Sequence, residues 1–240
     1  MNGSLSGTAP NVVYTPLSGF TGVDSFAFVA NDGVQDSEPA VVSIAVTGDV
    51  QPANDVSNPV TAITLDGSLA DWAGVTPFPA DPADISGEGN LIDWRQAWMA
   101  HSASTLYVAW QNATPVQELS WGHSLYFDTD RQSGTGFQGF GGEFTIGADY
   151  VLEGAELFRY TGTGRNWSWV SVGYVQRAVL GDIAEIAIPF ATIGNPDAIE
   201  FYLFGDSIAT GGSSVDVYPD VAADASAPDV SRRFGYSTAP

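Results

Sequence analysis

Four of the seven tryptophans in this chain lie among polar or turn-forming residues, where an indole ring can stay exposed to solvent. A pyranose has an apolar C–H face that stacks on a flat ring, and its hydroxyls need several hydrogen-bond donors and acceptors. Because the chain has no lysine, the arginines and the asparagine beside these tryptophans are the natural directional donors. The sequence therefore predicts a carbohydrate-binding site made of Trp94, Arg95, Trp121, Arg165, Asn166, Trp167 and Trp169.

The positions of the tryptophans leave one alternative open. Trp167 and Trp169 are two residues apart, so on a strand both rings would point to the same side. They could form a platform for a sugar, or they could cover one end of a β-sandwich. The remaining tryptophans, Trp72, Trp98 and Trp110, lie in strand or turn patterns that favour packing in the core.

A second group of residues has the chemistry of a hard-cation site. Asp128 and Asp130 end a strand-like segment and alternate to the same side, with Asp149 and Glu153 downstream. Calcium takes six to eight oxygen ligands from carboxylates, carbonyls and water. We therefore expect a structural calcium ion at these four residues. The carboxylates of the segment 66–72 could also bind a cation, but its glycine and tryptophan favour a turn with a packed ring.

No arrangement typical of an active site stands out. Carboxylate pairs are common in a chain with 28 acidic residues, so a glycosidase-like pair would mean something only in a cleft. His101 and His123 come without a nucleophile elbow, a zinc-protease motif or a phosphate loop. Met99 and His101 share a strand face and could ligate haem, although a core methionine and a turn histidine are the simpler interpretation. We expect the protein not to be an enzyme.

Charge narrows the choice of partners. The formal net charge is −21, with seven arginines as the only basic residues besides two histidines, so nucleic acid and anionic membrane surfaces are unexpected partners. No stretch approaches 18 apolar residues and no leader-like pattern follows Met1, so we expect neither a membrane-spanning helix nor a signal peptide, although a secretion signal could lie upstream. The absence of cysteine excludes disulfides and thiolate metal sites.

The elements that must position these residues are strands. Apolar residues alternate in the segments 25–30, 41–46, 106–110, 124–127, 183–188 and 201–204, while no window has helical spacing. The sequence thus predicts an all-β protein. Gly, Asp, Pro, Asn and Ser cluster in 48–59, which indicates a boundary between a first part, 1–50, a linker, 51–59, and a second part, 60–240.

The first part carries a recognisable series of motifs. They are Val12–Pro16, Gly19–Phe26, Asn31–Gly33, the alternating Val41–Thr47 and the closing Pro52–Asp55. In this order they resemble the cadherin-like, Ig-like tandem repeats of bacterial surface and secreted proteins. The resemblance covers roughly residues 1–58 and corresponds to the second half of such a sandwich. It implies a spacer in an extracellular protein.

The second part resembles a different family. Its motifs are Ile63–Trp72, Trp98–His101, Leu106–Ala109, Tyr126–Asp130, Gly136–Phe137, Ile146–Tyr150, Tyr160–Gly164 and Glu185–Pro189. Together they resemble the family 9 carbohydrate-binding modules and relatives with the same jelly-roll sandwich, which are often appended to bacterial polysaccharide-degrading enzymes. The resemblance spans most of 60–238. It implies a jelly-roll β-sandwich, and relatives with this fold carry structural calcium.

Together these observations predict a non-catalytic accessory fragment of a secreted or cell-surface bacterial protein that binds a polysaccharide or oligosaccharide and is stabilised by calcium. The alternative is a structural or adhesive subunit. An incomplete Ig-like part would expose strand edges, and strand donation from another chain would then build dimers or filaments.

Overall fold

The computed structural model describes residues 2–8, 11–16, 22–46, 55–81, 92–116, 118–139, 146–207, 215–218 and 233–238. The chain forms two compact units, Met1–Gln51 and Pro52–Pro240, which divide inside the Gly- and Pro-containing segment 48–59. Apart from two short 3₁₀ helices, the elements of the described residues are antiparallel β-strands, which confirms the all-β prediction. Among these residues no helix is long and apolar enough to span a membrane.

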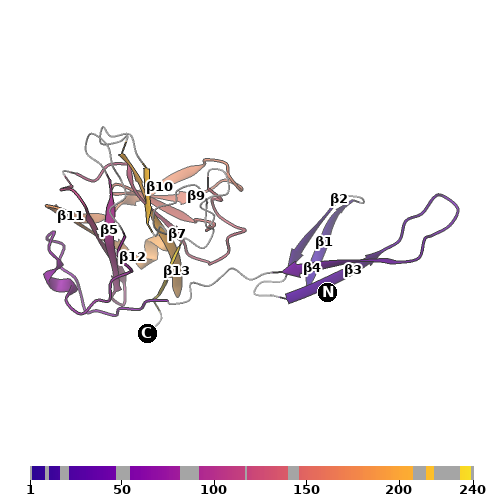
Figure 1. Cartoon of the computed structure of the whole chain (residues 1–240), viewed down its shortest axis with the longest axis horizontal. Helices are drawn as coiled ribbons and strands as arrows, with labels where there is room; N and C mark the ends of the chain where they lie inside the picture. Colours follow the sequence, from indigo (N-terminus) through magenta and orange to yellow (C-terminus); the bar gives the residue numbers. More distant parts are fainter. Residues whose placement is uncertain are drawn as a thin grey trace. The chain divides into compact units, whose positions relative to one another are not determined.

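The first unit consists of two β-hairpins, seen in indigo and violet in Figure 1. Gly3–Thr8 (β1) pairs with Asn11–Pro16 (β2), and Gly22–Phe28 (β3) pairs with Ala40–Val46 (β4). The hydroxyl of Tyr14 in β2 donates a hydrogen bond of 2.7 Å to Asp24 Oδ2 in β3, and Asp24 is only 6% exposed. A partly buried hydrogen bond to a carboxylate thus joins the two hairpins.

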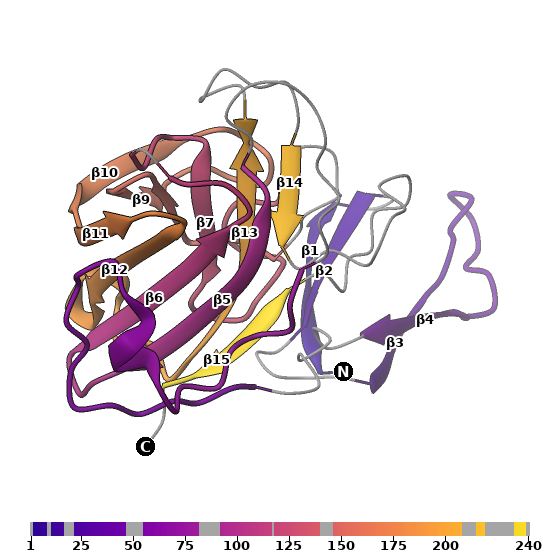
Figure 2. The same cartoon turned by 60° about the vertical axis from the view of Figure 1, so that its left-hand side comes forward.

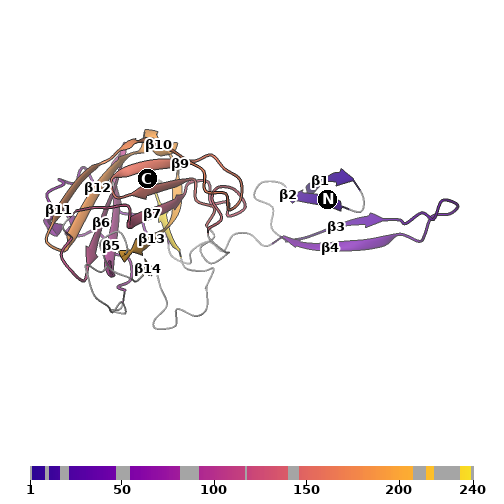
Figure 3. The same cartoon turned by 90° about the horizontal axis from the view of Figure 1, so that it is seen from above.

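The second unit is a sandwich of two antiparallel sheets. The first contains Trp94–His101 (β5), Thr105–Asn112 (β6), Gln176–Leu180 (β11) and Ile183–Pro189 (β12), in the order β11-β12-β6-β5. The second contains His123–Asp128 (β7), Tyr150–Glu153 (β8), Glu156–Tyr160 (β9), Trp169–Tyr174 (β10), Ala198–Asp206 (β13), Val215–Tyr218 (β14) and Phe234–Ser237 (β15). Its order is β10-β9-β8-β7-β13-β14, with β15 also on β13. Figure 2 shows the four-stranded sheet in front of the seven-stranded one, and Figure 3 shows both from above.

Alternation along each strand divides its side chains between the core and an outer face. In β13, Ile199, Phe201 and Leu203 lie in the core between the sheets, whereas Tyr202 and Phe204 belong to a cluster on the outer face of the seven-stranded sheet. The same period of two that predicted the strand therefore decides which side chains can reach the outer surface.

The outer face of the four-stranded sheet is closed by the turn that contains Leu69–Trp72 (η1, a 3₁₀ helix). The fully buried carboxylate of Glu185 accepts hydrogen bonds from Trp72 Nε1 (2.7 Å) and from the backbone N–H groups of Asp66 (2.9 Å) and Gly67 (2.5 Å). Gly67 has φ +78°, and a Cβ there would lie 2.4 Å from Cβ of Leu180, so only glycine fits. This turn is a packed lid, as its tryptophan predicted.

The three tryptophans expected in the core are there. Trp72, Trp98 and Trp110 are 3%, 9% and 2% exposed. Trp110 packs between the sheets, whereas Trp72 and Trp98 pack under the lid. Burial of such large rings contributes strongly to the stability of the sandwich.

Candidate functional site

The outer face of the seven-stranded sheet is covered at one end and open at the other. Over β7 and β13, Tyr126 and Tyr202 stack at 4.8 Å with an interplanar angle of 10°, and Phe137 helps to bury them. Over β8 to β10, Phe158 and Trp169 on the same face are only partly buried. Accessible aromatic surface therefore lies at the β8–β10 end.

Two hollows occupy this open end. The first, about 360 Å³, is lined by Val151, Glu153, Phe158, Trp167, Ser168 and Trp169. The second, about 280 Å³, is lined by Leu119, Ser120, Trp121, Glu153, Gly154, Ala155, Glu156, Phe158, Tyr174 and Arg177. Because Glu153 and Phe158 line both, the hollows are contiguous, and we refer to them together as the outer groove.

Three of the predicted tryptophans line the outer groove. Trp121 is 53% exposed and Trp167 is 49% exposed, so both offer ring surface to a ligand. Trp169 is more buried, with its ring centroid 5.0 Å from that of Tyr160 and 5.4 Å from that of Phe137.

Trp167 and Trp169 do not form the flat platform that was one of the two alternatives for them. Trp167 lies in the loop before β10 and not on the strand, and its ring makes an angle of 67° with that of Trp169, with centroids 5.6 Å apart. The two rings therefore meet edge to face, and Trp167 alone presents half its surface to solvent.

Trp94 is wrong as a candidate for sugar binding. It is 1% exposed and packs edge to face against Trp110 at 5.8 Å and His123 at 5.9 Å, inside the core. Its polar neighbour Asp93 misled the prediction, because Asp93 is itself buried, and the backbone N–H of Trp94 donates to Asp216 Oδ2 at 2.7 Å. Arg95 lies 3.5 Å from Asp93 Oδ1 and lines neither hollow of the groove.

Arg165 and Asn166 are exposed and lie in the loop that carries Trp167. The hydroxyl of Tyr160 donates to the carbonyl oxygens of Gly164 (3.0 Å) and Asn166 (2.9 Å), which anchors this loop to β9. Neither predicted side chain is part of the lining, so both are candidates only for the rim of the groove.

The structure brings together three of the four predicted cation ligands. Asp128, Asp130 and Asp149 each offer a carboxylate oxygen, and these oxygens all lie within 4.8 Å of one another. Asp128 ends β7, while Asp149 precedes β8 and accepts hydrogen bonds from the backbone N–H (3.0 Å) and hydroxyl (2.6 Å) of Thr129. Neighbouring strand ends and one loop thus form the cluster.

Asp128 is the most informative member of this cluster. Its Oδ1 accepts from the backbone N–H groups of Asp130 (3.1 Å) and Arg131 (2.7 Å). Its Oδ2 has no hydrogen-bond partner among the described residues, although the residue is fully buried. Burial, followed by the nearby charges of Asp130 and Asp149, raises the pKa of Asp128 to about 8. A bare buried carboxylate oxygen next to two others is the environment that a cation would stabilise.

Glu153 does not belong to this cluster. It ends β8, whereas Asp149 immediately precedes that strand, so the two lie about 13 Å apart along the backbone at ~3.3 Å per residue. The register places Glu153 opposite Ser124 and Glu156, in the outer groove. Its prediction as a metal ligand is therefore wrong. Glu153 is close to Asp149 in the sequence, but the extended strand between them holds the two residues apart.

Sequence reasoning missed a second carboxylate cluster, in which Asp81, Asp93 and Asp216 are all buried with ligand atoms within 4.8 Å. The three residues are far apart in the sequence and no motif connects them. All three have interactions within the protein, so the cluster is not assigned a ligand.

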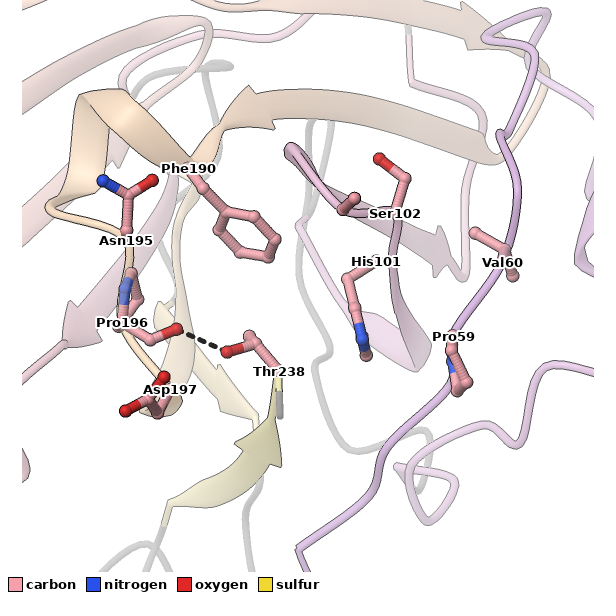
Figure 4. Close-up of a pocket in the computed structure, with 10 residues that line it drawn as sticks. Pro59, Val60, His101, Ser102, Phe190, Asn195, Pro196, Asp197 and Thr238 are labelled. Carbon is pink, nitrogen blue, oxygen red and sulfur yellow. Dashed lines mark hydrogen bonds between the residues drawn. The ribbon is translucent and has the colours of Figure 1, made fainter. Parts of the chain in front are cut away.

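A third hollow, of about 420 Å³, is larger than either hollow of the outer groove and lies elsewhere on the second unit. It is shown in Figure 4. Figure 4 shows Phe190 in the space between His101 and the Pro196–Asp197 segment. Phe190 is only 7% exposed, and none of the predicted sugar-binding residues lines this hollow. It lacks the exposed flat ring that carbohydrate recognition needs.

Comparison with known proteins gives a match for most of the first unit. Residues 1–45 are similar to the bacterial Ig domain family, which confirms the Ig-like prediction for this part of the chain. Domains of this family are typically extracellular or surface-exposed and suggest a surface or adhesive type of protein. No curated protein matches the chain. The resemblance of residues 60–238 to carbohydrate-binding modules therefore stays a prediction.

Proposed function

We propose that the second unit is a non-catalytic carbohydrate-binding module of a secreted or cell-surface bacterial protein, and that the outer groove is its binding site. The observation that carries this proposal is the pair of half-exposed indole rings, Trp121 and Trp167, on one contiguous groove lined by carboxylates, an arginine and tyrosine. Exposed indoles are costly to leave in water, and a sugar's C–H face covers them while its hydroxyls bond to the polar lining.

Affinity gel electrophoresis of the intact chain on a panel of plant, algal and bacterial polysaccharides tests this function. Trp121→Ala and Trp167→Ala should each weaken retention about 5- to 150-fold, by analogy with the ~1–3 kcal/mol lost per base when a stacking ring is removed. Both rings are half-exposed, so the melting temperature should change little. Val170→Ala, an equally exposed apolar residue outside the groove, is the control. Failure of every polysaccharide to retain the unmutated protein would overturn the proposal.

A calcium ion at Asp128, Asp130 and Asp149 is the second part of the proposal. The fully buried Oδ2 of Asp128, which has no partner in the described chain, supports it, together with the convergence of the other two carboxylates. The ion would be structural, since it would balance three negative charges at the ends of β7 and β8.

Assembly through strand donation is the second candidate function. It is favoured by the first unit, whose described strands form two separate two-stranded sheets with Val23 71%, Val41 69% and Val13 62% exposed. A two-stranded sheet is marginally stable alone, and an added strand would cover these side chains. Multi-angle light scattering tests it, since a monomer at working concentration with an ordered first unit contradicts assembly.

A further inference from the structure

We propose that the outer groove selects neutral, hydroxyl-rich polysaccharide chains and rejects polyuronates, and that Glu153 determines this selectivity. The inference rests on the proposed carbohydrate-binding function. Glu153 is the last residue of β8 and lines both hollows, so it lies where they meet. A ligand that extends from Trp167 to Trp121 must pass its carboxylate.

The shape of the groove indicates a chain and not a single sugar. Its two hollows, about 360 and 280 Å³, are each near the lower end of the range for small-molecule sites. Each also has its own exposed indole, Trp167 in the first and Trp121 in the second. Two rings on contiguous hollows fit consecutive sugar units of one chain.

The carboxylate of Glu153 is poised to accept hydrogen bonds from a ligand. The residue is half-buried, and within the described chain no hydrogen bond or ion pair reaches its carboxylate. Its neighbour in register, Glu156, is already occupied, because it accepts from the hydroxyls of Ser171 (2.6 Å) and Tyr174 (3.1 Å). Sugar hydroxyls are donors that would satisfy the hydrogen-bonding capacity of the Glu153 carboxylate.

A uronate at the same place would bring a third carboxylate beside these two. Burial and the charge of Glu156 already raise the pKa of Glu153, which shows that negative charge is disfavoured there even without a ligand. A ligand carboxylate has no proton to donate at neutral pH and would add repulsion, which is how a site rejects a competing ligand.

Among the described lining residues of the groove, Arg177 is the basic one that could oppose this preference. It is exposed and lines the second hollow, but the same hollow contains both Glu153 and Glu156, so the local charge remains negative. Arg177 does not line the first hollow, where Glu153 is the charged residue among the described lining.

Affinity gel electrophoresis of the intact chain tests the selectivity on neutral glucans, mannans and xylans against polygalacturonate and alginate. The net charge of −21 disfavours any polyanion, so each gel is also run at about 0.5 M salt to screen the long-range part. The variants are Glu153→Gln and Arg177→Gln, and Asp197→Asn, an exposed acid outside the groove, matches the charge change of Glu153→Gln.

We expect the unmutated protein to be retained by a neutral polysaccharide and by neither polyuronate. Glu153→Gln should weaken neutral retention about 10- to 100-fold, the range for a lost hydrogen bond to a charged group, and should narrow the gap between neutral and anionic chains, whereas Asp197→Asn should do neither. Polyuronate retention that Arg177→Gln abolishes would overturn the selectivity alone. Identical behaviour of Glu153→Gln and Asp197→Asn would overturn the role of Glu153. Absence of retention by any polysaccharide would instead remove the proposed function on which the inference rests.

Discussion

Removal of calcium should destabilise the second unit, and binding linkage gives the size of the effect. Binding to the native state adds RT ln(1 + [L]/Kd), about 4 kcal/mol for a micromolar site at millimolar calcium. Residues 52–240 fall in the size range where ~1 kcal/mol shifts the melting temperature by about 2–4 °C, so the expected shift is about 8–16 °C. Differential scanning calorimetry in chelator and in calcium measures it.

The variant Asp128→Asn distinguishes calcium binding at this site from a general effect of salt on stability, because the variant should lose stability in calcium but not in chelator. The amide oxygen of asparagine can still accept from the N–H groups of Asp130 and Arg131. With a pKa of about 8, the buried Asp128 carboxyl is mostly protonated at pH 7 when no cation is bound, so the amide replaces a neutral group of similar shape there but cannot supply the carboxylate that calcium needs. In chelator the variant should therefore be at least as stable as the unmutated protein, and in calcium it should be less stable. Asp197→Asn should respond to calcium as the unmutated protein does. Equal melting temperatures of the unmutated protein in chelator and in calcium would refute the cation site.

Two further predictions concern buried polar groups of the sandwich. Glu185→Gln places an amide where a carboxylate accepts hydrogen bonds from Trp72 and from the backbone of Asp66 and Gly67. Urea unfolding should therefore show a loss of about 2–4 kcal/mol in the free energy of unfolding. A loss equal to that of an exposed Glu→Gln change would contradict the stabilising role of these hydrogen bonds. Burial lowers the pKa of His123 from 6.5 to about 4, so the unfolded chain binds a proton that the folded chain does not, and the contribution of His123 to stability should fall by about 2 kcal/mol from pH 7.5 to pH 5. The raised pKa of Asp128 acts in the opposite direction, so the difference between the unmutated protein and His123→Gln measures the His123 contribution. Burial lowers the pKa of His101 in the same direction, so His123→Gln should remove only part of the slope, and an unchanged slope would count against a neutral His123.

The strands and their faces could be predicted because the alternation of apolar and polar residues within a strand can be read from a few neighbouring residues. The segments 106–110, 124–127, 183–188 and 201–204 all lie within strands of the second unit, and the inward residues of β13 are the apolar ones. The turn at 66–72 could also be predicted, since its glycine suits a tight turn and its tryptophan suits packing against the sandwich. What alternation cannot give is the neighbour of each strand, and hence which outer-face residues share a groove.

The candidate site shows where such local reasoning ends. Asp128 and Asp130 were predictable as a pair because two residues on one strand end face the same way. Glu153 was misplaced because four extended residues separate it from Asp149, and the register with Glu156 assigns it to the groove instead. Trp94 was misplaced because its polar neighbour Asp93 is buried with it, which composition alone does not reveal.

The cation site and the outer groove are parts of one structure. The loop that follows Asp128 continues to Phe137, whose ring lies 5.3 Å from that of Trp167 and 5.4 Å from that of Trp169. The next residue, Gln138, donates its backbone N–H to the carbonyl of Gly164 at 2.9 Å, in the loop that carries Trp167. Burial and the charges of Asp130 and Asp149 disfavour a charged Asp128 when no cation is present, whereas a bound cation would hold all three carboxylates together and fix this loop. Because Phe137 and Gln138 contact the loop that carries Trp167, we expect a cation at the acidic cluster to support the position of this indole ring, on which sugar binding is proposed to depend.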